Sequence, residues 1–437
     1  MFLRSFLKDT VFVLAAVILL GIAYGRVKKQ NEKDLDVQEA SETIHAPLPI
    51  AQIQIGDYTA LVPPGPNTLM DVPQNLTEKI REGLQNVSSV RLDKDKCIPS
   101  SILRTGWKRC LGNYILAATN AKGKIKLIEV YGGNASGSGF KVACERERAC
   151  ESGINPPFLI SAPAGWTVVA LRTVAYDKSS EDGVKAVVYI PYSSRLNTPE
   201  LRQAGLEYLK EAILGAWYEL RAKDIKSKYI DGKVVTDFGT PDHLSVLILT
   251  EQILSDIGFV NGSDAQRIEM LDRALVTLGL NRWKSYEYTL SPAGARGIGQ
   301  GMERTYTSIR GKYVLADLPE DHIEGRVDHH TAIKMMICHT DAEWWAIKNR
   351  PALLRNKWKR RLVFAAGYNA SIARVNKALE SCGNNWRESS CTKLPGETRR
   401  YLIKYEWIYK TLFDPAFRDR LQNTGLNMSD ATPIASK

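Results

Sequence analysis

Residues 291–300, SPAGARGIGQ, constrain the fold of this chain more than any other stretch. They contain three glycines and one proline, a composition that the interior of a helix or strand does not tolerate, yet helical patterns precede and follow them. We therefore predict a tight loop with an exposed main chain. Such a loop suits the floor of a binding site, because backbone groups can approach a ligand without side chains in the way. An ordinary glycine-rich connector has the same composition, so the stretch alone defines no function.

Two later stretches add to this loop. Residues 364–375 read FAAGYNASIARV, and residues 394–401 read LPGETRRY. In the same order, the three stretches resemble the Ser-Pro-x-Gly-Ala-x-Gly-hydrophobic-x-Gln, Ala-Ala-Tyr-Asn-Ala-Gly and Leu-Pro-x-Glu-Thr-x-x-Tyr segments of the lytic transglycosylases. These lysozyme-like enzymes cut the glycan strands of bacterial peptidoglycan. The chain departs from the second segment by an additional Gly367 and by Ser371 in place of the glycine. The resemblance covers less than half of the chain, from about Pro241 to Tyr409.

An uncharged apolar run, residues 10–25, is flanked by basic residues on both sides. At about 1.5 Å per residue it is slightly short for a hydrocarbon core of about 30 Å, unless Phe6 and Leu7 extend it. It is therefore either a retained membrane anchor or a cleaved signal peptide, and the basic residues directly after Gly25 favour the anchor.

The chain contains seven cysteines, and six of them form three closely spaced pairs without the spacing of a zinc site. We expect disulfide loops, with Cys97 and Cys110, Cys144 and Cys150, and Cys382 and Cys391 as candidates by proximity. Cys338 lies in the apolar run MMIC and is expected to be a buried thiol. Disulfides form in oxidising compartments, and the resemblance implies a bacterial envelope. We therefore expect a bacterial inner-membrane protein facing the periplasm, or a periplasmic protein if the N-terminal segment is cleaved.

Residues 97–192 carry the signal of β structure. The apolar runs 114–119 and 124–131 are separated by Asn-Ala-Lys-Gly, which favours a hairpin, and the runs 166–176 and 184–189 form a second pair. A long amphipathic helix pattern follows over residues 198–224, with Thr198 as its cap and Pro199 in its first turn. Helical patterns then continue from Asp242.

These signals together predict an α+β fold class, composed of an N-terminal membrane helix, a β-rich middle domain and a C-terminal all-α lysozyme-like domain. The expected boundaries are 1–29 for the anchor or signal, 30–50 for a tether, 51–195 for the β-rich accessory domain, 196–235 for a linking helix and 236–437 for the transglycosylase domain.

The net charge of +11 suits a polyanionic partner such as an acidic cell wall, anionic lipid or nucleic acid. The sequence has no zinc-finger spacing, phosphate-binding Gly-Lys-Ser/Thr loop or basic motif interleaved with aromatic residues, so nucleic acid is not expected. The expected partners are peptidoglycan glycan strands, the inner membrane through the N-terminal helix, and envelope or secretion machinery.

Cutting a glycosidic bond requires a carboxylic acid that stays protonated near neutral pH. A glutamate at the end of an apolar helix suits this role, because burial raises its pKa. The family places its glutamate nine residues before the Ser-Pro loop, where this chain has Arg282. A catalytic glutamate of this chain would therefore lie at another position.

Glu251 and Glu287 are the two candidates. Glu251 ends an apolar helix pattern that begins at Thr240 and Pro241, but it requires an insertion before the loop that contains the helix pattern of residues 264–278. Glu287 needs no insertion and lies between two tyrosines, but no helix pattern ends at it and positions it in a cleft. We favour Glu251 as the catalytic residue and keep Glu287 as the alternative.

The resemblance also implies a set of substrate-binding residues: Ser291, Ile298, Gln300, Tyr368, Asn369 and Tyr401. The resemblance implies that Gln300 bonds sugar or orients the acid, and that the main chain near Ile298 lines a subsite. Tyr368 and Asn369 serve the N-acetyl groups and hold the acid, and Tyr401 stacks at the far wall.

The implied reaction uses one glutamate as acid and then as base, cleaves the β-1,4 bond between MurNAc and GlcNAc, and forms 1,6-anhydro-MurNAc without a metal or cofactor. The histidines of residues 328–330 and His339 form the cluster to consider as a metal site. The interval between His330 and His339 does not place both on one helix face, so no metal site is expected. The alternative function is a non-catalytic peptidoglycan-binding or scaffold protein of an envelope assembly, which Arg282 at the usual acid position favours.

Overall fold

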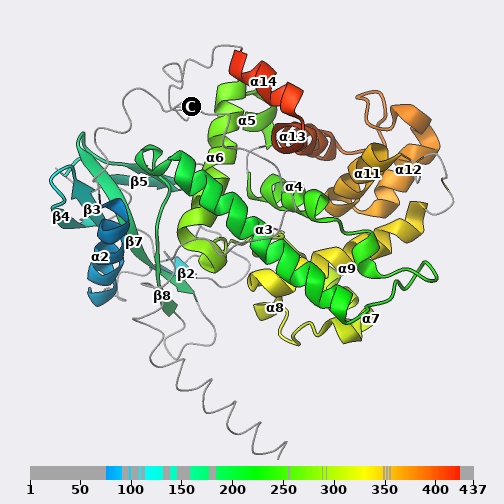
Figure 1. Cartoon of the computed structure of the whole chain (residues 1–437), viewed down its shortest axis with the longest axis horizontal. Helices are drawn as coiled ribbons and strands as arrows, with labels where there is room; N and C mark the ends of the chain where they lie inside the picture. The colour runs from blue at the N-terminus through cyan, green and yellow to red at the C-terminus, as the bar shows by residue number, and fades with distance from the viewer. Residues whose placement is uncertain are drawn as a thin grey trace, which may run out of the picture.

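The computed structural model describes residues 75–90, 98–99, 108–109, 114–130, 138–144, 158–176, 184–253, 256–287, 289–291, 293–347, 350, 353 and 356–423. Figure 1 shows a small sheet on one side of the molecule and a larger body of helices on the other. The expected α+β class with a β-rich middle domain and a separate all-α lysozyme-like domain is wrong. The described chain is mostly helical and carries a small antiparallel sheet.

The physical reason lies in where the apolar residues are buried. The largest hydrophobic cluster is built from helices and extends from Leu206 to Leu421, whereas the strands contribute two smaller clusters. No helix in the described part of the chain is long and apolar enough to cross a bilayer. Residues 1–29, where the sequence predicts the membrane helix, lie outside the described residues.

The main sheet has four antiparallel strands in the order β4-β3-β7-β8. The elements of this part are α2 (Leu76–Ser89), β1 (Ile98–Pro99), β2 (Lys108–Arg109), β3 (Tyr114–Asn120), β4 (Ile125–Val130), β5 (Lys141–Cys144), β6 (Phe158–Ser161), β7 (Trp166–Tyr176), β8 (Val184–Tyr189) and η2 (Ser194–Leu196). Both predicted strand pairs are confirmed. In the first hairpin, the Asn120 side chain accepts the N–H groups of Lys122 and Lys124.

The sheet is buried on both faces because β3 alternates between two clusters. Leu116 packs on one face with Phe140 and Val142. On the other face, Ile115 packs with Ile80 of α2 and with Val276 of α6, a helix of the larger body. The sheet therefore shares a core with the helices.

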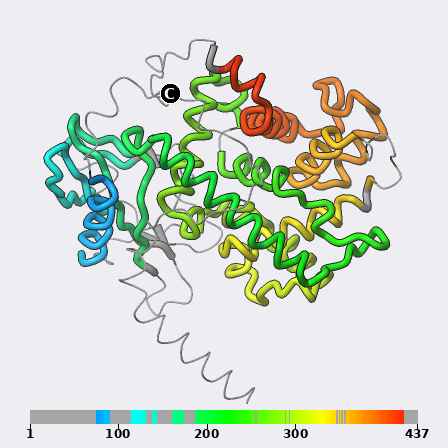
Figure 2. Tube along the Cα trace, in the orientation of Figure 1, coloured from blue at the N-terminus to red at the C-terminus, as the bar shows by residue number. Residues whose placement is uncertain are grey.

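The helical body follows in series. Its elements are α3 (Pro199–Ala222), η3 (Val235–Asp237), α4 (Pro241–Gln252), α5 (Asp256–Asn261), α6 (Asp264–Asn281), η4 (Arg282–Lys284), α7 (Glu303–Lys312), η5 (Val314–Ala316), α8 (Glu324–Val327), α9 (His329–Ile347), α11 (Lys357–Ala370), α12 (Ile372–Cys382), η6 (Gly383–Asn385), α13 (Gly396–Phe413) and α14 (Pro415–Asn423). Figure 2 shows this succession as the colour change from green to red.

Helix α3 connects the two sides of the molecule (Figure 1). It begins as predicted, because the Thr198 side chain accepts the N–H of Leu201 and Pro199 occupies the first turn. Along its length it contacts α6, α4 and α9. Asn281 at the end of α6 adds a polar joint to the strand side, since its side chain bonds both the N–H and the carbonyl of Ile190, at 2.8 and 2.9 Å.

Ser371 marks the turn between α11 and α12 and stands where the segment that this stretch resembles has glycine. Its φ of 84° and ψ of 139° belong to a region that glycine alone adopts without strain. We expect Ser371→Gly to stabilise the protein by about 1 kcal/mol, since relief of strain exceeds the entropy that glycine loses on folding. Urea unfolding measures the change. Ser88→Gly, on the exposed side of α2, is the control and is expected to destabilise; an equal destabilisation by Ser371→Gly would contradict the prediction.

Candidate active site

Helix α4 brings Glu251 to the edge of the hydrophobic core. Residues 243–250 of this helix are buried, because α3, α9 and α13 pack around it. Glu251 is partly exposed. The helix ends at Gln252, and the carbonyl of the next residue, Ile253, accepts a hydrogen bond from the buried ammonium of Lys404 at 2.5 Å. An apolar helix thus carries one carboxyl group to a position that solvent reaches.

Burial raises the pKa of Glu251 from 4.5 to about 7. Two neighbours act in the opposite direction. Tyr401 donates a hydrogen bond to the carboxyl oxygen Oε1 at 2.6 Å, and the positive charge of Lys404 favours the carboxylate. Desolvation outweighs both, so a substantial fraction of Glu251 is protonated at neutral pH, which is the state that a general acid needs.

The loop of residues 291–300 is shaped by its own polar groups. The Ser291 hydroxyl accepts the N–H of Ala295 at 3.0 Å, and the Gln300 amide donates to the carbonyl of Gly297 at 2.8 Å. These two side chains, which the resemblance assigns to the substrate, therefore bond within the loop. Three consecutive residues in the second half of the loop are buried: Gly297, Ile298 and Gly299. The main chain there is therefore less exposed than the sequence predicts.

Gln252, which sequence reasoning missed, joins α4 to the loop. Its Nε2 donates to the carbonyls of Ile298 and Gly297, at 2.6 and 3.2 Å, across separations of 46 and 45 residues. The chain between them forms α5, α6 and η4, and α6 packs along α3. The segment between Gln252 and Gly297 therefore begins next to Glu251, and its far end lies against the same end of α4. The sequence feature that could have identified Gln252 is an amide side chain directly after the candidate acid at the end of an apolar helix.

A buried arginine holds the loop from the opposite side. Arg326 on α8 is 2% exposed, and its Nη1 donates to the carbonyls of Gly294 and Gly301 at 3.0 and 3.2 Å. Gly297 has a φ of +68°, and a β-carbon there would overlap the carbonyl oxygen of Arg326. The glycines thus allow close packing of the loop on α8.

The predicted residues of α11 and α13 take different positions. Tyr401 bonds Glu251 directly. Tyr368 donates its hydroxyl to the carbonyl of Gly299, and its pKa is raised by burial and then by the nearby carboxyl groups of Glu251 and Glu343. Asn369 accepts a hydrogen bond from Thr398 at 2.9 Å and so links α11 to α13. The two tyrosines therefore lie at or near Glu251, whereas Asn369 forms a hydrogen bond between α11 and α13.

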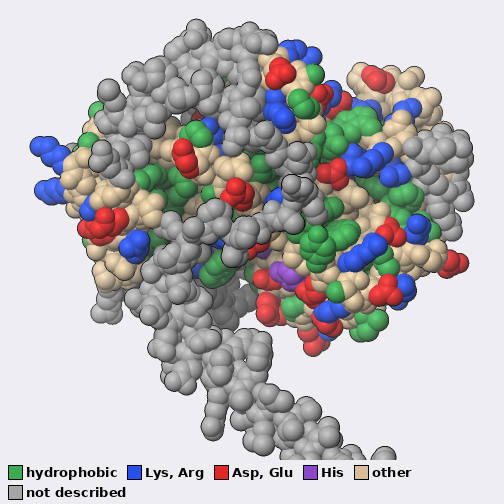
Figure 3. All heavy atoms as spheres, in the orientation of Figure 1, with side chains coloured by type: hydrophobic (Ala, Val, Ile, Leu, Met, Phe, Trp, Pro, Cys, Tyr) green, Lys and Arg blue, Asp and Glu red, His purple; other side chains and the backbone are tan. Residues whose placement is uncertain are grey.

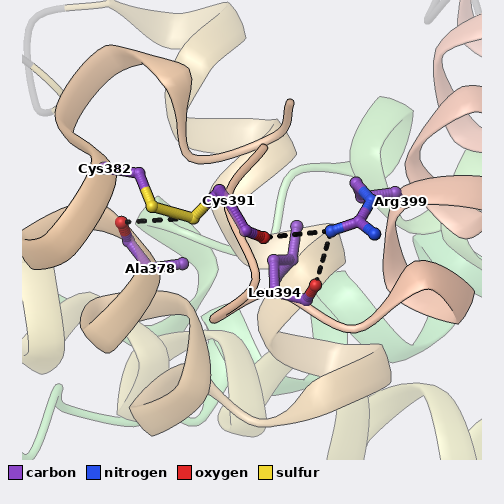
Figure 4. Close-up of a disulfide and its surroundings, with 5 residues drawn as sticks. All are labelled: Ala378, Cys382, Cys391, Leu394 and Arg399. Atoms are coloured by element: carbon purple, nitrogen blue, oxygen red, sulfur yellow. Dashed lines mark hydrogen bonds between the residues drawn. A yellow bond between two sulfur atoms is a disulfide. The ribbon is translucent and has the colours of Figure 1, made fainter. Parts of the chain in front are cut away.

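A disulfide supports the start of α13, as Figure 4 shows. The predicted bond between Cys382 and Cys391 is confirmed. Arg399 donates to the carbonyls of Cys391 and Leu394, at 3.1 and 2.6 Å, and ties the closed loop to the first turns of the helix that bears Tyr401. Cys338 is a buried free thiol, as expected. The side chains of the other four candidate cysteines, Cys97, Cys110, Cys144 and Cys150, lie outside the described residues.

The alternative acid, Glu287, lies in the turn after η4, between α6 and the loop. Its neighbour Tyr286 is buried and bonds the carbonyl of Ala274 on α6. Arg282, at the usual acid position of the family, caps the end of α6 and pairs with Glu211 on α3 at 2.9 Å. The carboxyl that meets Tyr401 and lies near Tyr368 is that of Glu251.

The histidines of α9 have separate partners. His329 bonds the hydroxyl of Tyr208 at 2.7 Å and the carbonyl of Ser285 at 2.6 Å, and His330 pairs with Glu219 on α3. Among the described residues, no group of three or more histidine, cysteine, aspartate or glutamate side chains is arranged to hold a metal ion.

We expect Tyr401→Phe to raise the pKa of Glu251, because the lost hydrogen bond favours the carboxylate. In the glycan cleavage that the resemblance implies, the high-pH limb of the pH–rate profile should move upward from about 7, and the rate should fall about tenfold, the effect of one hydrogen bond. Tyr405→Phe is the matched control, since this buried tyrosine on the same helix bonds His243 instead. A high-pH limb that moves downward in Tyr401→Phe would contradict the expectation.

No protein-family model, curated protein or solved structure matches this chain.

Proposed function

We propose that this protein is a lytic transglycosylase that cleaves the β-1,4 bond between MurNAc and GlcNAc in peptidoglycan, with Glu251 as its acid and base. The observation that carries the proposal is the position of Glu251. Glu251 lies at the end of the buried helix α4, and its carboxyl group accepts a hydrogen bond from Tyr401. The next residue, Gln252, bonds the same helix end to the glycine-rich loop. The three stretches that resemble the family thus meet around one acid with a raised pKa.

The proposed reaction balances on this single carboxyl group. Protonated Glu251 gives its proton to the oxygen of the leaving GlcNAc as the glycosidic C–O bond breaks. The resulting carboxylate then takes the proton of the 6-hydroxyl of MurNAc, whose oxygen bonds the anomeric carbon and closes the 1,6-anhydro ring. Glu251 is protonated again at the end. Burial favours the acid form at the start, and the Tyr401 hydroxyl stabilises the carboxylate in between.

The disulfide supports the expected location. We propose that the protein faces the periplasm, where a disulfide such as Cys382–Cys391 persists and peptidoglycan is at hand. Basic and acidic side chains are interspersed on the face shown in Figure 3, so attraction to an acidic wall would come from the net charge of +11 and not from one basic patch on this face.

Digestion of purified sacculi tests the proposal. The full-length protein is incubated with sacculi, and the soluble products are analysed by mass spectrometry. Release of 1,6-anhydromuropeptides supports a lytic transglycosylase, whereas products with a free reducing end would indicate hydrolysis. Sacculus binding without any product would favour the alternative, a non-catalytic peptidoglycan-binding protein.

A further inference from the structure

Glu343 is a second buried carboxyl group near Tyr368, and the proposed reaction does not use it. It lies on α9, is 2% exposed, and its Oε1 has no hydrogen-bond partner among the described residues. Burial raises its pKa well above 4.5, so the neutral acid is favoured. A buried polar atom without a partner costs free energy, so its presence requires an explanation.

Oε1 of Glu343 faces Nδ1 of His339, one helical turn earlier on α9, at 3.8 Å. Nδ1 is buried and likewise has no hydrogen-bond partner within the described chain. The distance exceeds that of a hydrogen bond, so a bond between the two groups requires a rotation of one of the side chains. Burial lowers the pKa of His339 to about 4, with a further contribution from Lys312 on α7, so the imidazole is neutral. A neutral acid and a neutral imidazole suit one O–H···N bond.

Part of the His339 side chain reaches solvent. The side chain is 21% exposed although its Nδ1 is buried, so the exposed part belongs to its other atoms. The ring stands at 88° to that of Tyr368, with centroids 5.5 Å apart. Tyr368 in turn bonds the glycine-rich loop and lies near Glu251. His339 is therefore separated from the candidate acid by one tyrosine.

Gly367 makes room for this arrangement. It is the additional residue of the stretch FAAGYNAS, directly before Tyr368 on α11. A β-carbon at this position would lie 2.6 Å from Oε1 of Glu343. The chain thus omits a side chain where the carboxyl group packs.

We propose that His339 and Glu343 form a glycan-binding pair beside Glu251, in which Glu343 donates its O–H to Nδ1 and the Nε2–H of His339 donates to an oxygen of the saccharide. Glu343 is a positioning residue, because it fixes the tautomer and does not touch the ligand. The class of ligand rests on the proposed function, but saccharide binding is measured independently of bond cleavage.

Binding of chitotetraose to the full-length protein in a Glu251→Gln background tests the pair. Calorimetry should show that Glu343→Leu and His339→Phe each weaken binding about tenfold, the effect of one hydrogen bond. Glu343→Gln should stay within about twofold, since its amide also donates to Nδ1. Glu380→Leu is the matched control, because this exposed glutamate lies on the neighbouring helix α12.

Two further readouts separate this role from a structural one. Glu343→Leu should raise the Tm while binding weakens, because it replaces an unpartnered buried acid by an apolar group; a structural role predicts that both fall. Nitrogen NMR of the histidines, assigned through His339→Gln, should show His339 with its proton on Nε2.

Three results would overturn the pair: a proton on Nδ1, a Glu343→Gln variant as weak as Glu343→Leu, or no binding of chitotetraose. If chitotetraose binds but the wild-type protein releases no anhydromuropeptide, the pair is supported and the proposed catalytic function is refuted.

Discussion

Glu251→Gln is expected to reduce the release of 1,6-anhydromuropeptides from sacculi by about 10²–10⁴-fold, the usual contribution of a general acid and base. The amide has nearly the shape of the acid, and its oxygen can still accept the Tyr401 hydroxyl, so the site keeps its geometry. It has no proton of suitable acidity for the leaving oxygen. Mass spectrometry of the soluble products measures the loss.

The same substitution should increase stability at high pH. Burial holds the pKa of Glu251 at about 7 in the folded protein, against 4.5 for the exposed group. Folding stability is therefore highest below about pH 4.5 as far as this group is concerned, and falls as pH rises to about 7. Since glutamine does not ionise, Glu251→Gln should be more stable than the wild type at pH 8 by on the order of 3 kcal/mol, and nearly equal at pH 4.

Glu287→Gln is the matched control for both measurements, because it makes the same chemical change in the turn after η4. We expect it to release products at close to the wild-type rate and to show no comparable stabilisation at pH 8. If products persist in Glu251→Gln and disappear in Glu287→Gln, the assignment of the acid is wrong and Glu287 takes the role.

Gly297→Ala is expected to destabilise the protein by about 2–5 kcal/mol. Its φ of +68° disfavours any side chain by about 1–2 kcal/mol. In addition, the new methyl group would meet the backbone carbonyl of Arg326, which cannot rotate away as a side chain can, and such overpacking costs a further 1–3 kcal/mol or more. The shift would also disturb the carbonyl that Gln252 and Gln300 both bond.

Gly294→Ala separates the two contributions. Gly294 has a φ of +91°, but nothing lies within 4 Å of the β-carbon that it would gain. We expect a loss of only about 1–2 kcal/mol from backbone strain. Urea unfolding of both variants measures the costs, and the sacculus assay measures the effect on the site. Equal costs would show that the loop yields at Arg326 and that its packing on α8 is not tight.

Local features of the fold were predictable from local residues. Asn120 and Gly123 predict the first hairpin, and Thr198 with Pro199 predicts the start of α3, because turns and helix caps depend on neighbours within a few positions. The apolar run before Glu251 likewise predicts a buried helix with an acid at its end. The fold class was wrong because strand signals were taken to form a separate domain, whereas Ile115 and Val276 share one core between sheet and helix.

The sequence by itself determined which residue types stand at the candidate site: an acid at a helix end, a glycine-rich loop, and tyrosines on later helices. Only the tertiary structure decided how they meet. Tyr401 reaches Glu251 across 150 residues, and Gln252 reaches Gly297 across 45. Periodicity and spacing report on neighbours along one helix or strand, whereas contacts of this range depend on how whole helices pack, so the partners of Glu251 could not be predicted from the pattern of residues alone.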